Sequence, residues 1–410
     1  MKTTIEILAI LIIGCASASA QVAPAATGPG GIPVTGNLHY AFRYAQTAEF
    51  GTSLGNWQTS TSSASLDYAN RNERLPFSMN YSGGYTWTIT GPSYRTGIFQ
   101  HLLLSQGFAW RKWNATISDD VSYRPQAPTT GFSGIAGIGE PIGGSGSTPP
   151  SSQSILTLNA HVVENDANLE IEHGLNYATK LNLGGGLSLL RFLDGNGLDT
   201  NTAMANAGLS WRLDARNSLS GRYMLSEFSY PGFSASFASQ SALLGYSREW
   251  SRKVSTNISA GPQWIGSTDS KFLPPSTRIA ANAAFDYKFR FVSASLAYDH
   301  GANGGAGYSL GAERDSIHAG FSRDFGRSLT IGLEGGYLRT AGLRNNGVTN
   351  AKYGGGQLTK RLGRYLNVFA NYTVMDQSSS SKLPSNVLNN LLQVFSCGIE
   401  YSPREKHIRP

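Results

Sequence analysis

The sequence predicts an all-β protein: a transmembrane antiparallel up-and-down β-barrel of about 18 strands, with short periplasmic turns and long extracellular loops. A hairpin unit with a short basic turn recurs about every 37 residues, as in the segments that begin at Tyr246, Phe321 and Leu358. Self-similarity at a fixed period indicates one repeated supersecondary unit. The runs between the turns alternate apolar and polar residues, which is the pattern of a half-buried strand. Charged residues make up only 14% of the chain, against about 25% in soluble domains.

The strands and their connections follow in order from this pattern. Alternation is cleanest over 279–289 and recurs over 38–44, 77–81, 113–117, 205–213, 329–333, 366–372 and 395–401. Short turns are expected near residues 72, 112, 182, 216, 252, 290, 327 and 364, and long loops over 47–57, 194–201, 266–276, 341–350 and 377–390. Eight turns and chain ends on one side make nine hairpins and therefore 18 strands; 16 strands follow if the first or last hairpin is irregular. An even strand number with alternating short and long connections is typical of outer-membrane barrels.

The ends of the chain indicate export. Lys2, a short apolar core and the Ala18-Ser19-Ala20 site predict a signal peptide over 1–20. A flexible periplasmic leader over 21–36, a barrel over 37–402 and a periplasmic tail over 403–410 complete the expected organisation. Ile12-Ile13-Gly14-Cys15 also resembles a lipobox, so lipidation at Cys15 stays open beside ordinary cleavage.

The interval after the second expected turn contains an insertion over 126–153 that is rich in Gly, Pro and Ser and shows no strand pattern. Long loops of this kind are usually functional or disordered. Two interpretations stay open: the insertion folds into the barrel and narrows it, or it is a mobile extracellular loop.

A barrel of 16–18 strands is too wide for side chains to fill and encloses an aqueous channel. Because apolar positions face lipid, the alternate positions are expected to line the lumen, and a register error of one residue would reverse each assignment. The expected lumen-lining residues are Arg43, Arg222, Asp286, Lys288, Arg314, Glu334, Asn282, Asn367 and Asn371. The same parity adds Asn80, Asp67, Glu170, Glu172 and Asp299.

The net charge of +7 suggests an anion-preferring pore, but the bases concentrate at the short turns. There they are expected to meet lipid phosphates at the membrane interface, with the outward-facing Arg248, Arg323 and Lys360 extending toward it. Aromatic residues near the same turns are expected to form an interface girdle. Its members are Trp110, Trp113, Trp211, Trp250, Phe289 and Phe325.

Chemical motifs are absent from the sequence. The seven histidines are scattered, no cysteine cluster exists, and neither a metal site nor a cofactor nor a nucleic-acid groove is expected. Ser316 and His318 share one strand face, as in lipid-hydrolysing barrels, but parity turns both into the lumen and no orienting acid or amide is evident.

The turn segments YSREWSRKVSTNIS and FSRDFGRSLTIG resemble those of bacterial β-barrel porins, including the barrels of exopolysaccharide gene clusters. The resemblance implies an outer-membrane pore in a Gram-negative-type bacterium, inserted by the barrel assembly machinery. We expect no enzyme but a porin-like channel that contacts outer-membrane lipids and passes small hydrophilic solutes. The alternatives are an export conduit for exopolysaccharide and a structural barrel with an occluded lumen.

Overall fold

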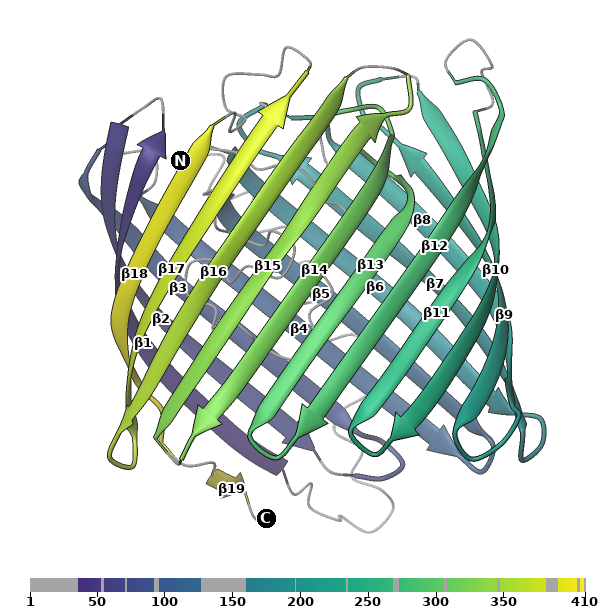
Figure 1. Cartoon of the computed structure of the whole chain (residues 1–410), viewed down its shortest axis with the longest axis horizontal. Coiled ribbons are helices and arrows are strands. Elements are labelled where there is room, and N and C mark those ends of the chain that lie inside the picture. Colours follow the sequence, from purple (N-terminus) through teal and green to yellow (C-terminus); the bar gives the residue numbers. More distant parts are fainter. Residues whose placement is uncertain are drawn as a thin grey trace.

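The computed structural model describes residues 36–52, 55–70, 72–91, 96–126, 160–195, 197–233, 235–267, 273–305, 308–326, 328–344, 347–380, 390–403 and 406–408. These residues form one closed antiparallel barrel of 18 long strands (Figure 1). The strands are β1 (Gly36–Thr52), β2 (Gly55–Asn70), β3 (Phe77–Thr90), β4 (Gly97–Trp110), β5 (Trp113–Gln126), β6 (Ala160–Gly174), β7 (Thr179–Phe192), β8 (Thr200–Arg212), β9 (Asn217–Ser229), β10 (Ser236–Ser251), β11 (Val254–Gly266), β12 (Ser276–Phe289), β13 (Val292–Asn303), β14 (Ala312–Phe325), β15 (Leu329–Gly342), β16 (Val348–Leu362), β17 (Leu366–Ser379) and β18 (Leu391–Tyr401). The predicted fold class is therefore confirmed.

The barrel closes between its first and last strands. Each strand pairs with its neighbours in the chain, and β1 pairs with β18 from Phe42↔Tyr401 to Phe50↔Gln393. A short strand, β19 (Lys406–Ile408), continues the closure by pairing with the first three residues of β1. Closure leaves no open sheet edge, which is the condition for β-structure to cross a membrane.

The register divides every strand into an inner and an outer face. Residues paired across an antiparallel ladder point to the same side, so one assignment carries around the whole wall. One alternate set contains the large apolar side chains that the protein leaves exposed, such as Leu244 at 70% and Ile279 at 65%. The other set contains Trp57, Glu49 and Gln377, which are buried. The exposed apolar set is the outer face and the second set is the inner face.

The two ends of the barrel differ in their connections, which we name the turn end and the loop end (Figure 1). At the turn end, side chains of Asn72, Asn176 and Asp214 accept hydrogen bonds from the backbone two residues on, at 2.7–2.9 Å. Such Asx turns reverse the chain within a few residues. Short connections at this end therefore have a local cause that the sequence carries.

Two connections differ from the sequence-based expectation. The turn expected near residue 182 lies at 175–178, and Asn182 belongs to β7. The long loop expected over 47–57 is mostly strand, because β1 continues to Thr52 and β2 starts at Gly55. In both places Asn, Gly and Ser, which favour turns, are paired in the β-ladder.

No helix in the described part of the chain is long and apolar enough to cross a membrane.

Candidate functional site: the lumen

The inner face carries all of the residues that parity predicted to line the lumen. Their positions follow from the ladder register of β1, β9, β12, β14, β15 and β17. Four inner-face side chains form a continuous hydrogen-bonded chain across β11–β14. Ser259 donates to Asn282 at 2.7 Å, Asn282 donates to Asp299 at 2.8 Å, and Arg314 pairs with Asp299 at 2.7 Å. On the other side of the barrel, Asn367 donates to Glu400 at 3.1 Å.

The exposure of the inner-face side chains changes along the axis of the barrel. Toward the turn end, inner-face residues such as Arg222, Asn282 and Lys288 are exposed. Toward the loop end, inner-face residues are buried, including Thr61 at 2% and Gln263 at 6% exposure. Polar side chains there bond to one another, as in Thr61–Thr86 at 3.0 Å and Gln263–Ser239 at 2.8 Å. Inner-face side chains are thus exposed toward the turn end and closely packed toward the loop end.

One loop accounts for part of this packing. It is the connection between β13 and β14, of which residues 304–305 and 308–311 are described. Tyr308 contacts the ring of Phe192 on β7 at a centroid distance of 5.6 Å and packs on Val162 and Leu190. Because β7 and β14 are not neighbours in the sheet, this contact crosses the bore.

The base of the loop is held by an apolar cluster on the inner face. Its buried members are Phe228, Tyr230, Phe237, Ile265, Leu273 and Leu343, with Leu310 of the loop packed against them. The hydroxyl of Tyr230 donates to the carbonyl oxygen of Gly304 at 3.0 Å. Burial raises the pKa of the Tyr230 phenol, so the hydroxyl keeps its proton and remains a donor. Leu343 N–H donates to Gly311 at 3.1 Å and fixes the other end.

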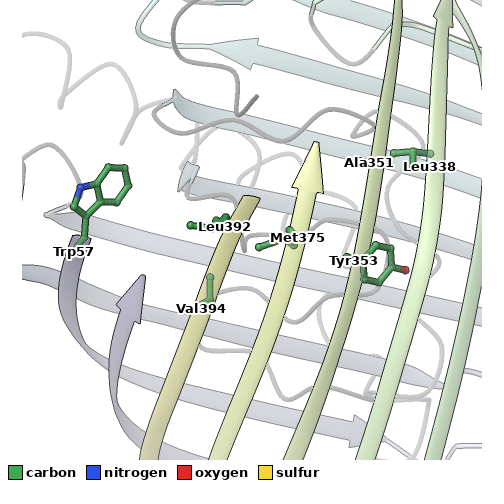
Figure 2. Packing of buried hydrophobic residues seen from close by; sticks show 7 residues of the cluster. All are labelled: Trp57, Leu338, Ala351, Tyr353, Met375, Leu392 and Val394. Carbon is green, nitrogen blue, oxygen red and sulfur yellow. The ribbon is translucent and has the colours of Figure 1, made fainter. Parts of the chain in front are cut away.

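A second apolar cluster lines the loop end on β2 and β15–β18. Figure 2 shows its members: Trp57, Leu338, Ala351, Tyr353, Met375, Leu392 and Val394. All have inner-face parity, so they are side chains that alternation assigns to a water-filled lumen. Their burial follows from the packing of the loop-end half and could not be predicted from strand patterns. The insertion over 126–153, for which the sequence leaves both a constriction and a mobile extracellular loop open, falls almost entirely outside the described residues.

The aromatic residues expected to form a girdle lie on the outer face beside the short turns. Trp110 is 63% exposed, and the other five are also exposed. Cations lie over three of the rings of this set: Arg248 over Trp250 at 3.9 Å, Lys253 over Phe289 at 3.5 Å and Arg323 over Phe325 at 4.6 Å. Such pairs place amphipathic rings and bases in one narrow band, as a membrane interface requires.

Several ionisable residues on the outer face were missed by the parity rule. His300 lies between Glu313 and Asp315, with nitrogen–oxygen distances of 3.3 and 2.6 Å, and Arg339 pairs with Asp315 at 3.1 Å. These residues are near the loop end of β13–β15, beyond the apolar part of the outer face. Asp119, hydrogen-bonded by Asn165 at 2.7 Å, is a second exception. Each of these polar residues has its partner on an adjacent strand. Only the ladder register shows which residues are adjacent, so the alternation pattern of a single strand does not predict these pairs.

Among the described residues, no catalytic or metal centre is present. His318 hydrogen-bonds through Nδ1 to the hydroxyl of Tyr353 at 2.6 Å and has no bond to Ser316 within the described residues. No group of three potential metal ligands occurs in the described ranges.

Comparisons with known proteins give a fold likeness only. No family model matches the sequence, and no curated protein matches it. Among solved structures the chain is similar to Pseudomonas aeruginosa OccK2 (OpdF), with 12% identity, a TM-score of 0.49, and 90% of this chain and 97% of that chain covered. It is also similar to Acinetobacter baumannii OccAB3, with 10% identity, a TM-score of 0.46 and coverages of 90% and 99%. A BenF-like porin from Pseudomonas fluorescens Pf-5 shares 11% identity, with a TM-score of 0.46 and coverages of 91% and 99%. At such identities these likenesses do not indicate a solute.

Proposed function

We propose that the chain is an outer-membrane channel that passes small hydrophilic solutes by passive diffusion. The observation that carries the proposal is the closed 18-strand wall with an apolar outer face and a polar inner face. A wall of this size encloses an aqueous space, and the exposed inner-face residues at the turn end line it. The turn end faces the periplasm, because short turns mark that side of outer-membrane barrels.

The packed loop end makes the channel restrictive. Loop 304–311 and the two apolar clusters occupy the extracellular half, so a solute meets a narrow entrance before a wide vestibule. A conduit for a polysaccharide needs an open bore along its whole length, and this packing does not favour it. Hydrolysis is not favoured either, because His318 is engaged by Tyr353 and faces away from lipid.

Single-channel recording in planar bilayers tests the proposal. Purified protein is expected to give discrete, ohmic current steps in potassium chloride. Tyr308→Ala removes the ring that contacts Phe192 across the bore, and larger steps are expected from it. Tyr177→Ala is the matched control, because Tyr177 is a fully exposed tyrosine in a turn. Complete absence of current from wild type and Tyr308→Ala would favour the occluded barrel instead.

A further inference from the structure

Glu334 is an inner-face carboxylate with one covered oxygen that lacks a hydrogen-bond partner among the described residues. It lies in the middle of β15, where the exposed turn-end half of the lumen meets the packed loop-end half. Its Oε1 atom is covered by protein and has no hydrogen-bond partner. No ion pair to Glu334 occurs among the described residues. Leaving a buried acceptor unsatisfied costs about 1–3 kcal/mol, and more for a charged group.

Glycines flank Glu334 in the wall. In the ladder, Glu334 pairs with Gly320 of β14 on one side and with Gly355 of β16 on the other. The neighbouring inner-face position toward the turn end on β15 is Gly332, where a Cβ would meet nothing closer than 3.8 Å. The two paired glycines add no side chain beside the carboxylate, and the hydroxyls of Ser295 and Thr373 lie over them, 3.0 and 3.1 Å from where a Cβ would stand.

An aromatic bridge lies next to Glu334 toward the loop end. Tyr353 of β16, Gly336 of β15 and His318 of β14 occupy one row of the ladder. The Tyr353 ring passes over Gly336, and its hydroxyl meets His318 Nδ1 at 2.6 Å. His318 Nδ1 and the Tyr353 hydroxyl bond to each other, and among the described residues neither side chain bonds to Oε1 of Glu334.

A second unsatisfied acceptor faces the same stretch of lumen. Asn371 of β17 is one row nearer the turn end and two strands away, and its Oδ1 is covered and without a partner. Neighbouring strands are about 4.8 Å apart and one row is about 7 Å along a strand, so the two side chains start roughly 12 Å apart. Gln357 lies between them, but its amide donates to Thr359 at 3.0 Å. A ligand that completes both residues must bring hydrogen-bond donors.

Internal cations do not fill this role. Arg314 is on the inner face of the adjacent strand, three positions nearer the loop end, and pairs with Asp299 at 2.7 Å. Its guanidinium is held on the β13 side, away from Glu334.

We infer that Glu334 binds the ammonium group of a cationic solute as it passes the narrow part of the lumen, with Asn371 accepting a further hydrogen bond. A carboxylate accepts only, and hydrogen bonds from a charged donor are about twice as strong as neutral ones. The inference rests on the proposed channel function and gives it a substrate class, small organic cations.

Permeability measurements with a matched pair of ions test the inference. Butylammonium chloride and sodium butyrate have the same carbon chain and opposite charge. In wild type, reversal potentials are expected to show butylammonium preferred over butyrate. Glu334→Gln keeps the shape of the side chain and is expected to lower this preference about tenfold, which corresponds to about 1.4 kcal/mol.

Glu400→Gln is the control for charge. It makes the same change on the inner face at a carboxylate that already accepts a hydrogen bond from Asn367, and it is expected to change the preference less than twofold. Equal effects of the two substitutions would reduce the role of Glu334 to one charge among several and overturn the inference.

Calorimetry separates this inference from the channel proposal. Butylammonium is titrated into detergent-solubilised wild type and Glu334→Gln, and heat of binding is expected only from wild type. Glu334-dependent binding without any bilayer current would overturn the channel and keep the site. Bilayer current with neither binding nor preference dependent on Glu334 would keep the channel and overturn the site.

Discussion

Replacing Gly336 by alanine tests the bridge over the lumen wall. An added Cβ would lie 2.6 Å from Cε1 of the Tyr353 ring and 2.5 Å from the carbonyl oxygen of Ile317. Real Cβ atoms do not approach so closely, so the ring must leave its position. Overpacking costs about 1–3 kcal/mol, and losing the Tyr353–His318 hydrogen bond adds about 0.5–1.5 kcal/mol. Alanine regains about 0.5–1 kcal/mol over glycine within a strand.

The expected net loss is therefore about 0.5–4 kcal/mol for Gly336→Ala. Urea unfolding of the detergent-folded barrel, followed by tryptophan fluorescence, should show a lower midpoint with an unchanged slope.

Gly332→Ala is the matched control, because it changes the next inner-face glycine of the same strand. Its nearest atom is Cβ of Gln357 at 3.8 Å, an ordinary contact. We expect Gly332→Ala to be neutral or slightly stabilising. Equal midpoints for the two variants would refute the reasoning that Tyr353 needs a glycine beneath its ring.

Two further predictions concern the loop and a turn. Tyr230→Phe removes the hydroxyl that donates to Gly304 and destabilises the packed position of the β13–β14 loop by about 1 kcal/mol. The population of displaced loop conformations should therefore rise roughly fivefold, and single-channel current noise measures this rise. Tyr337→Phe is the control, because its hydroxyl bonds Asn350 on the outer face, and it should leave the noise unchanged. At the turn end, the backbone N–H of Arg216 is the main cause that lowers the pKa of Asp214, with help from Asn217. Because the pKa of Asp214 is lower in the folded protein, its carboxylate stabilises the turn fully at pH values above the unfolded-state pKa. That stabilisation is lost as the pH falls through the folded-state pKa. Hydrogen-exchange protection of the Arg216 amide should therefore decrease in acid, and Asp214→Asn should remove this dependence; a variant that retains it would show that another group titrates.

Much of the wall could be predicted because its determinants are local. Alternation over 279–289 places Ile279 outside and Asn282 inside, and closure then fixes the same parity around the barrel. Asx residues such as Asp214 shorten the turns, which sets the polarity of the two ends. The misplaced turn also has a local cause, since the segment near residue 182 contains Gly and Asn, which favour turns, yet it lies in β7.

The interior could not be predicted in the same way. Parity assigns Trp57, Met375 and Glu334 alike to the lumen, yet it does not say which of them meets water. Trp57 and Met375 are buried because the loop end is packed, whereas Glu334 stands at its edge. The contact of Tyr308 with Phe192 joins positions more than a hundred residues apart and leaves no mark on either strand pattern.

The sequence by itself thus determined a barrel, its strand number, its two ends and the side to which most residues point. These follow from backbone pairing and a two-residue period, which are properties of short segments. The tertiary structure alone decided which part of the inner face is packed, that Tyr308 meets Phe192, and that covered oxygens of Glu334 and Asn371 lack a hydrogen-bond partner among the described residues. Those features depend on which strands face each other across a closed wall, and that is set only when all 18 strands have met.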